Sequence, residues 1–483
     1  MSRGGLSGAG GSGGSQGWLD CRGSGLGEFS SRSARLGLGV LLQGLSLTLA
    51  LLVGAPPSFA QTSDERSLDE VAIRQAIDEV EDLYSEGRYT EALALGEQIV
   101  EAAEQGLGPD HTSTLRGADR LAVIYSALGR YAEAEPLLER ALETEGRVLG
   151  LEHPDTLASV NNLAILHMSQ GRYVEARPLM MRALEVRERV LGREHPDTLG
   201  SVNNLAVLLM TQGRYAEAEP LMDRALEARE RVLGREHPDT HASVNNLARL
   251  YWRENRFAEA EPLMMHALDG RERVLGPAHP DTLASVDNLA RLYSDQGRYT
   301  EAEPLYQRAL DGQERALGPD HPNTLTSVNN LGILHWNQGR YAEAELLYLR
   351  ALEGRQRVLG TEHPDTLASV NNLAILSWDQ GHYADAEPLL ERALEGRERA
   401  LGRQHPDTLA SRDNLARLYA DQGRYAEAEP LMERAVKGRQ RVLGLEHPDT
   451  LASMNYLVRI YTEQGRYAEA EMMRERTPDS VEP

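Results

Sequence analysis

A 42-residue period is the feature of this sequence that most limits what the chain can fold into. The dipeptide His-Pro recurs at 42-residue intervals from residue 153 to residue 447, and Gly-Arg-Tyr recurs in the same register from residue 87 to residue 465. The tripeptide varies twice, to Asn255-Arg256-Phe257 and to Gly381-His382-Tyr383. The register holds through ten units without an insertion. One such unit cannot bury an apolar face alone, so the period predicts a solenoid in which each unit packs on the next.

Each unit contains two stretches with helical periodicity. In the unit from His195, apolar residues recur every three or four positions on both sides of Gly213, as on the buried face of a helix. Pro196 follows the histidine at the first helical turn, where a backbone N–H has no intrahelical partner. Pro220 is expected within the first turn of the second helix for the same reason. Gly234 precedes the next His-Pro and predicts the end of that helix.

The repeated pattern N-L-A-x6-G-R-Y-x-x-A-x3-[LMY]-x-x-A-L resembles the tetratricopeptide repeat. The residues of one unit that match its signature are Leu205, Ala206, Gly213, Tyr215, Ala218, Met222 and Ala225. The common repeat has 34 residues. The eight additional residues, with the linker LGxxHPDT, resemble the variant found in kinesin light chains. The resemblance implies an all-α fold, a right-handed superhelical solenoid of about ten helix-turn-helix tetratricopeptide repeats.

The resemblance extends over nearly all of the chain that follows residue 60. We therefore expect the solenoid to span residues 61–477 and a short C-terminal tail to span residues 478–483. The first repeat, residues 67–110, diverges, because Glu79 and Val80 stand where Leu-Ala is expected. A terminal repeat needs a polar outer face, so this unit is interpreted as a solubilising cap.

The N-terminal region differs in composition from the repeats. Residues 1–30 are rich in Gly and Ser without a hydrophobic period, which predicts a disordered tail. Residues 31–60 have the layout of a secretory signal peptide, with two arginines, an apolar stretch over residues 36–53 and a Ser-Phe-Ala site that ends at Ala60. The alternative is an uncleaved anchor helix over residues 36–53, since about 18 apolar residues can just span a bilayer. We expect cleavage after Ala60 and an exported protein, periplasmic or secreted; the anchor would instead hold it on a membrane.

Composition and motifs argue against several classes of function. The net charge of −23 argues against nucleic-acid binding, which needs basic side chains to neutralise phosphates. The one cysteine, Cys21, lies in the N-terminal tail, so no disulfide framework or thiolate metal site is available to the repeats. No nucleophile elbow, zinc-protease or phosphate-loop motif is present. We therefore expect no enzymatic activity and no cofactor.

The repeated histidines are interpreted as cap and turn residues. Histidine and aspartate in series resemble metal ligands, but neighbouring helices pack about 10 Å apart. Zinc ligands must converge to roughly 2 Å from one ion. We therefore expect no metal site at these residues.

By the resemblance to tetratricopeptide arrays, the first helix of each unit lines a concave groove, and the first asparagine of the Asn-Asn pair faces inward. That position holds Asn161, Asn203, Asn245, Asn329, Asn371 and Asn455, with Asp119, Asp287 and Asp413 in other units. Two interpretations stay open. The amides bind the backbone of an extended peptide, or they bond neighbouring helices and set the angle between repeats.

Two further positions on the same face vary between units. Four residues beyond the asparagine stand Ile165, Val207, Arg249, Arg291, Ile333, Ile375, Arg417 and Arg459. Three residues further stand Met168, Met210, Trp252, Ser294, Trp336, Trp378, Ala420 and Thr462. Trp and Arg are common anchors of protein interfaces. The alternative is that the tryptophans are partly buried packing residues.

These observations predict a non-enzymatic scaffold that binds an extended protein segment with acidic and apolar side chains. The candidate groove residues are Asn161, Asn203, Asn245, Arg249, Trp252, Asp287, Arg291, Asn329, Trp336, Asn371, Trp378, Asp413, Arg417, Asn455 and Arg459. We expect no nucleic-acid partner, and membrane contact only if the N-terminal segment stays uncleaved. The alternative function is a structural, self-assembling envelope protein whose regular arrays stack end to end.

Overall fold

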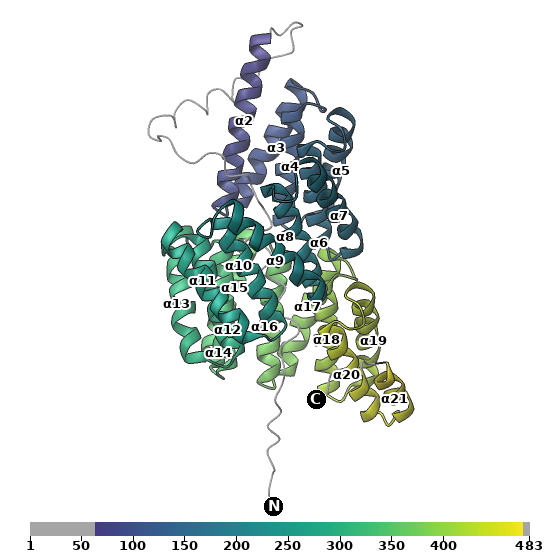
Figure 1. The fold of residues 1–483 in the computed structure, drawn as a ribbon. Helices are drawn as coiled ribbons and strands as arrows, with labels where there is room; N and C mark the ends of the chain where they lie inside the picture. The colour runs from purple at the N-terminus through teal and green to yellow at the C-terminus, as the bar shows by residue number, and fades with distance from the viewer. Residues whose placement is uncertain (1–62, 477–483) are drawn as a thin grey trace, which may run out of the picture.

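The computed structural model describes residues 63–476, and side chains from residue 70 onward. Within these residues the chain forms twenty α-helices and no strand, which confirms the predicted all-α solenoid of ten helix pairs (Figure 1). We number the pairs as units 1 to 10. The first helices of the units are α2 (Ser63–Ser85), α4 (Thr112–Ala127), α6 (Pro154–Ser169), α8 (Pro196–Thr211), α10 (Pro238–Arg253), α12 (Pro280–Asp295), α14 (Pro322–Asn337), α16 (Pro364–Asp379), α18 (Pro406–Asp421) and α20 (Pro448–Glu463). The second helices are α3 (Tyr89–Gly106), α5 (Tyr131–Val148), α7 (Tyr173–Val190), α9 (Tyr215–Val232), α11 (Phe257–Leu275), α13 (Tyr299–Leu317), α15 (Tyr341–Leu359), α17 (Tyr383–Leu401), α19 (Tyr425–Val442) and α21 (Tyr467–Glu475).

Residues 1–62 and 477–483 lie outside the described residues. The predicted tail, signal peptide and cleavage point at Ala60 all fall there, as does the C-terminal tail. Among the described residues, no helix combines the length and the apolar character needed to cross a bilayer.

The repeated His-Pro motif starts the first helix of units 3 to 10 as predicted. His153 is the N-cap of α6, and its Nδ1 accepts a hydrogen bond from the backbone N–H of Asp155 at 3.3 Å. The same arrangement begins α8 to α20. Pro220 is the sixth residue of α9, just beyond its first turn. The helix starts directly after the Gly213 turn, so the proline leaves free only the carbonyl of Ala216, near the start of the helix.

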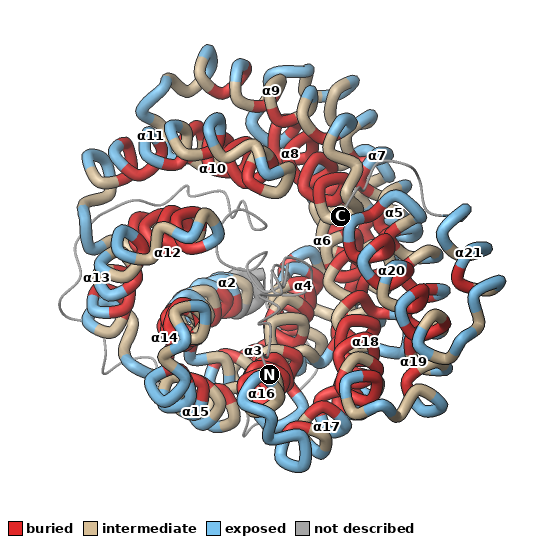
Figure 2. Tube along the Cα trace, turned by 90° about the horizontal axis from the view of Figure 1, so that it is seen from below, coloured by how far each residue is buried: buried red, intermediate tan, exposed pale blue. Residues whose placement is uncertain are grey.

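Small residues let the helices of neighbouring units approach closely. Ala206, Ala218 and Ala225 are fully buried, and Leu205 and Met222 fill the space between them. These are signature positions of the repeat, and equivalent residues recur in the core of every unit from 3 to 9. The core is therefore one continuous apolar layer between the first and second helices. Figure 2 shows the first helices on the inner side of this layer and the second helices outside it.

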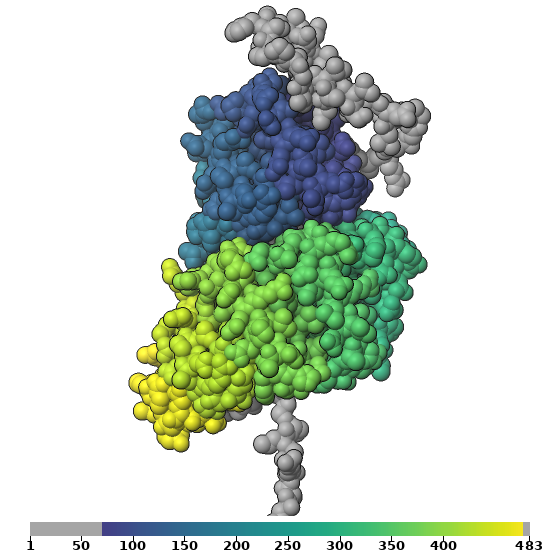
Figure 3. Space-filling view, turned by 180° about the vertical axis from the view of Figure 1, so that it is seen from behind, coloured from purple at the N-terminus to yellow at the C-terminus, as the bar shows by residue number. Residues whose placement is uncertain are grey.

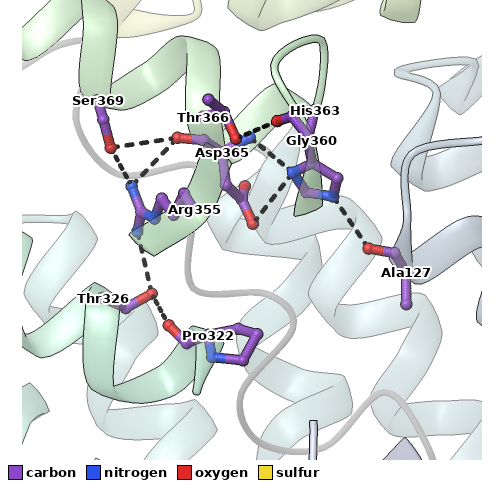
Figure 4. Close-up of polar contacts among 9 residues, drawn as sticks. All are labelled: Ala127, Pro322, Thr326, Arg355, Gly360, His363, Asp365, Thr366 and Ser369. Carbon is purple, nitrogen blue, oxygen red and sulfur yellow. Dashed lines mark hydrogen bonds and ion pairs between the residues drawn. The ribbon is translucent and has the colours of Figure 1, made fainter. Parts of the chain in front are cut away.

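The superhelix winds far enough for its second turn to meet its first. Units 1 to 4 lie against units 7 to 10 (Figures 1 and 3). His363, at the start of α16, reaches the carbonyl oxygen of Ala127 at 2.9 Å (Figure 4). One unit later, His405 reaches the carbonyl oxygen of Ser169 at 3.1 Å. Leu401 and Leu443 join the apolar clusters of the first turn. One superhelical turn therefore corresponds to six units, and we call the contact between the turns the seam.

Candidate functional site

The sequence-predicted groove residues all lie on first helices, from α6 to α20, which form the inner side of the superhelix (Figure 2). Their exposure differs along the chain. Asn203, Asn245, Arg249 and Trp252 in units 4 and 5 are buried. The positions on α14 to α20 that vary between units remain partly exposed or exposed, except Ala420, which is buried.

The first asparagines form a ladder of amides between successive inner helices. Four of the six accept a hydrogen bond from the second asparagine of the next unit. These bonds join Asn204 Nδ2 to Asn161 Oδ1 (2.9 Å), Asn246 to Asn203 (2.8 Å), Asn372 to Asn329 (2.8 Å) and Asn414 to Asn371 (3.0 Å). The amides therefore bond neighbouring helices, which is the second of the two interpretations. Peptide binding by the same positions stays a prediction. Of these asparagines, Asn455 is exposed.

The aspartates at the first-asparagine position have different partners. Asp287 accepts from Ser327 at 3.1 Å and from Asn330 at 2.7 Å, and so continues the ladder. Asp413 pairs with Arg417 at 2.7 Å and with Arg439 at 3.4 Å. Two of the three aspartates are thus held by donors or cations of neighbouring positions.

Asp119 faces a second carboxylate. In six units a buried or half-buried arginine of the second helix donates to a serine of the next unit, as Arg355 does to Ser369 at 2.9 Å (Figure 4). In unit 2 that position holds Glu145, and Ser159 donates to Glu145 at 2.7 Å or to Asp119 at 3.0 Å. Burial, and then the charge of Glu145, raise the pKa of Asp119 to about 7. Burial also raises the pKa of Glu145.

Trp252 is a packing residue in this structure, as the alternative interpretation proposed. Its side chain is 8 % exposed and belongs to the apolar core of units 5 to 7. The indole Nε1 donates to Asp295 at 3.0 Å, and the Arg291 guanidinium lies 5.0 Å from the centre of the indole ring. The polar edge of the ring is therefore satisfied within the chain.

Most of the accessible side chains at the two variable positions lie on the inner helices of units 7 to 10, although Ile165 and Arg291 are partly exposed as well. We call the set in units 7 to 10 the inner patch; it consists of Ile333, Trp336, Ile375, Trp378, Arg417, Tyr456 and Arg459. Trp336 donates to Asp379 at 2.7 Å, which fixes the orientation of its ring. The part of the patch in units 7 and 8 is apolar. The part in units 9 and 10 carries two guanidinium groups.

Tyr456 is a patch residue that the sequence analysis missed. Arg417 and Arg459 lie 4.9 and 5.1 Å from the centre of its ring. Its hydroxyl donates to Asp421 at 2.9 Å, and Arg459 pairs with the same carboxylate at 3.3 Å. The signal was present in the sequence, because Tyr456 replaces the second asparagine of the repeat. A departure from a position that is constant in units 3 to 9 marks it in the same way as the tryptophans.

The described residues contain no group of three or more His, Cys, Asp or Glu side chains arranged to hold a metal ion. The inner patch offers aromatic and aliphatic surface next to guanidinium groups, which are the features of a surface that binds another macromolecule.

Comparison with known proteins identifies the repeat. Two sequence models described as tetratricopeptide repeat match residues 80–144, 156–197, 199–273, 240–311, 282–357, 329–399, 366–440 and 408–477. These matches cover most of the chain and confirm the resemblance given by the repeated motif. No curated protein is significantly similar to the chain.

Three solved structures illustrate the similarity. One contains the nearly identical TPR-like repeats of a protein described as a kinesin light chain, from Podosopora anserina; it is 34 % identical, covers 41 % of this chain and 94 % of its own, and has a TM-score of 0.35. BtubC (BKLC) from P. vanneervenii is 25 % identical over 48 % of this chain and 92 % of its own, with a TM-score of 0.40. The human IFIT1 dimer with PPP-AAAA is 15 % identical over 87 % and 95 %, with a TM-score of 0.45.

Proposed function

Because the chain belongs to the tetratricopeptide repeat family, whose scaffolds are typical of protein–protein interaction, we propose that it is a non-enzymatic scaffold that binds an extended segment of a partner protein on the inner side of its superhelix. The observation that carries the proposal is the inner patch. It gathers the variable, partly exposed aromatic and cationic side chains of four consecutive units, while the constant residues around them bond the helices to one another.

The chemistry of the patch suggests the chemistry of the segment. An extended chain advances about 3.3 Å per residue, whereas successive helix pairs lie about 10 Å apart, so every third residue of the segment meets the next unit. Trp336, Trp378, Ile333 and Ile375 favour apolar side chains at one end. Arg417 and Arg459 favour carboxylates at the other end. The carboxylates of the segment would compete there with Asp413 and Asp421 for the two guanidinium groups.

A pull-down with matched variants tests this proposal. The bait is the full chain, and the inner variant carries Trp336→Ala and Trp378→Ala. The control carries Leu346→Ala and Leu349→Ala, which truncate exposed apolar side chains on the outer helix α15. We expect a protein from envelope or secreted fractions to bind the wild type and the control, and to be lost from the inner variant, while circular dichroism shows equal helix content. The same protein on all three baits, or none on any, would contradict the proposal.

The proposal extends to where the protein acts. The arginines, apolar stretch and Ser-Phe-Ala site of residues 31–60 support export, with cleavage after Ala60. Mass spectrometry of the purified native protein tests this directly. A mature N-terminus at Gln61 agrees with export, and an intact residue 36–53 segment in a membrane fraction would instead support the anchor.

A further inference from the structure

The same His-Pro motif occurs in two environments. The side chains of His153, His195, His237 and His279 are 39 to 40 % exposed. Those of His363, His405 and His447 are 0 to 8 % exposed, and His321 is buried as well. Their sequence context and their role as helix caps are the same. The difference is the seam, because only units 7 to 10 have an earlier turn of the superhelix beside them.

The seam joins two groups that a helix pair leaves open. The Nδ1 of His363 accepts the N–H of Asp365 at 3.0 Å, so the ring proton of the neutral imidazole is on Nε2. Nε2 then donates to the carbonyl of Ala127, the last residue of α4 (Figure 4). His405 and Ser169 repeat the arrangement one unit later. These two seam contacts therefore each satisfy a cap residue and a helix C-terminus at once.

The glycine of the Gly-Arg-Tyr turn makes this approach sterically possible. A Cβ on Gly129 would lie 2.8 Å from Pro364 Cδ, and one on Gly171 would lie 2.6 Å from Pro406 Cδ. In these two units the tyrosine that follows is covered, since Tyr131 and Tyr173 are 3 to 4 % exposed. The seam is thus a close, partly apolar contact.

The two sides of the seam, the histidine helix starts and the glycine turns, also occur in units that have no second turn of the superhelix beside them. The histidine rim consists of His111, His153, His195, His237 and His279, at the starts of α4 to α12. The glycine rim consists of Gly297, Gly339, Gly381, Gly423 and Gly465, around which no other part of the described chain lies within 4 Å of an added Cβ. On the glycine rim Tyr341, Tyr383 and Tyr467 are 37, 38 and 70 % exposed. The two rims face opposite ways along the superhelix axis, because each first helix runs from its histidine to its glycine turn.

We propose that a second copy of this chain docks its histidine rim on the glycine rim of the first, through the contacts that the seam makes within one chain. Unit n contacts unit n+6 at the seam, so continuation of that register places Gly297 against His111 of the second copy and Gly465 against its His279. The surface is heterologous, with different residues on its two sides, and does not close on itself. Repetition therefore produces a filament and not a dimer. This inference uses the rims alone and does not depend on the inner patch.

Two variants of the full chain each block one rim. The first variant carries Gly339→Asn, Gly381→Asn and Gly423→Asn on the glycine rim. At the equivalent glycines of the seam, an added Cβ would collide with the other turn of the superhelix, so these side chains should block docking in the same way. Asn255 shows that the turn accepts this residue, since it holds a φ of 58° at the equivalent position of unit 5. His153→Asp, His195→Asp and His237→Asp keep a good N-cap acceptor but remove the Nε2 donor and place a carboxylate towards a carbonyl.

Sedimentation velocity at low and high salt reads out the assembly, because the net charge of −23 makes like-charged copies repel at low salt. We expect the wild type to form a concentration-dependent series of oligomers and each variant alone to lose every species larger than the monomer. An equimolar mixture of the two variants retains one intact rim of each kind, so it should give a single heterodimer. A strictly monomeric wild type, oligomers that persist in both variants, or a mixture that stays monomeric would each overturn the proposal.

Discussion

Asp119 and Glu145 give the most quantitative test of the packing. Both carboxyl groups are buried, and they share the hydroxyl of Ser159 where other units place an arginine. The pKa of Asp119 rises from its ordinary value of 3.8 to about 7. A difference of about three units corresponds to about 4 kcal/mol between the charged and neutral forms in the folded state.

The sign of the pH dependence follows from this direction. The folded protein holds the Asp119 proton more tightly than the unfolded chain does, so it binds more protons between about pH 4 and pH 7. Its stability therefore falls as the pH rises through that window and levels off above it. Asp119→Asn removes the ionisation and places the residue found in units 3, 4 and 5. The variant should match the wild type near pH 4 and exceed its stability by up to about 4 kcal/mol at pH 8.

Hydrogen exchange measures this effect locally, since repeats open in part and not as a whole. At pH 8 the most protected amides of α4 and α6 should exchange up to about a thousandfold more slowly in Asp119→Asn than in the wild type. The control is Asp413→Asn, which removes the partner of Arg417 and of the buried Arg439 and should destabilise the chain. A gain that is equal at pH 4.5 and pH 8, or a loss at pH 8, would refute the reasoning.

Three other changes test single features. Gly171→Asn should open the seam and lower the free energy of unfolding in urea, while Gly423→Asn, outside the seam, should change it by no more than about 0.5 kcal/mol when the chain is monomeric; equal effects would contradict the seam. His241→Leu should stabilise the chain by about 1 to 3 kcal/mol, because both ring nitrogens are buried without a hydrogen-bond partner among the described residues and other units hold leucine there. Burial lowers the pKa of His241, so the folded state resists protonation and the gain should be larger at pH 5 than at pH 8 in chemical denaturation; a gain that does not grow with acidity would contradict this. Asn372→Ala should cost about 1 kcal/mol by breaking one rung of the ladder, and an unchanged midpoint would remove that rung from the account.

Much of the fold was predictable because its causes are local. The His-Pro start, the glycine turn and the apolar spacing each act within one unit, and a constant period repeats them. Which asparagine interpretation holds was not predictable, since an amide on an inner helix has donors and acceptors for either role. The structure decides it for four rungs of the ladder through bonds to the next unit.

The seam and the burial of single groove residues were beyond the sequence for a different reason. His363 and Ala127 are separated by 236 residues, and their contact depends on small rotations summed over six units. No pattern within one repeat contains that sum. Arg249 and Arg291 occupy the same position of the repeat, yet Arg249 is buried and Arg291 remains partly exposed.

Photo-crosslinking from single positions tests the central claim, that the inner patch binds an extended protein segment, most directly. A photoreactive phenylalanine analogue replaces Ile375 in the inner patch in one protein and Leu346 on the outer helix α15 in another. Our account predicts a discrete covalent adduct with a partner protein from position 375, and none from position 346. Adducts of equal yield from both positions, or from position 346 alone, would contradict it.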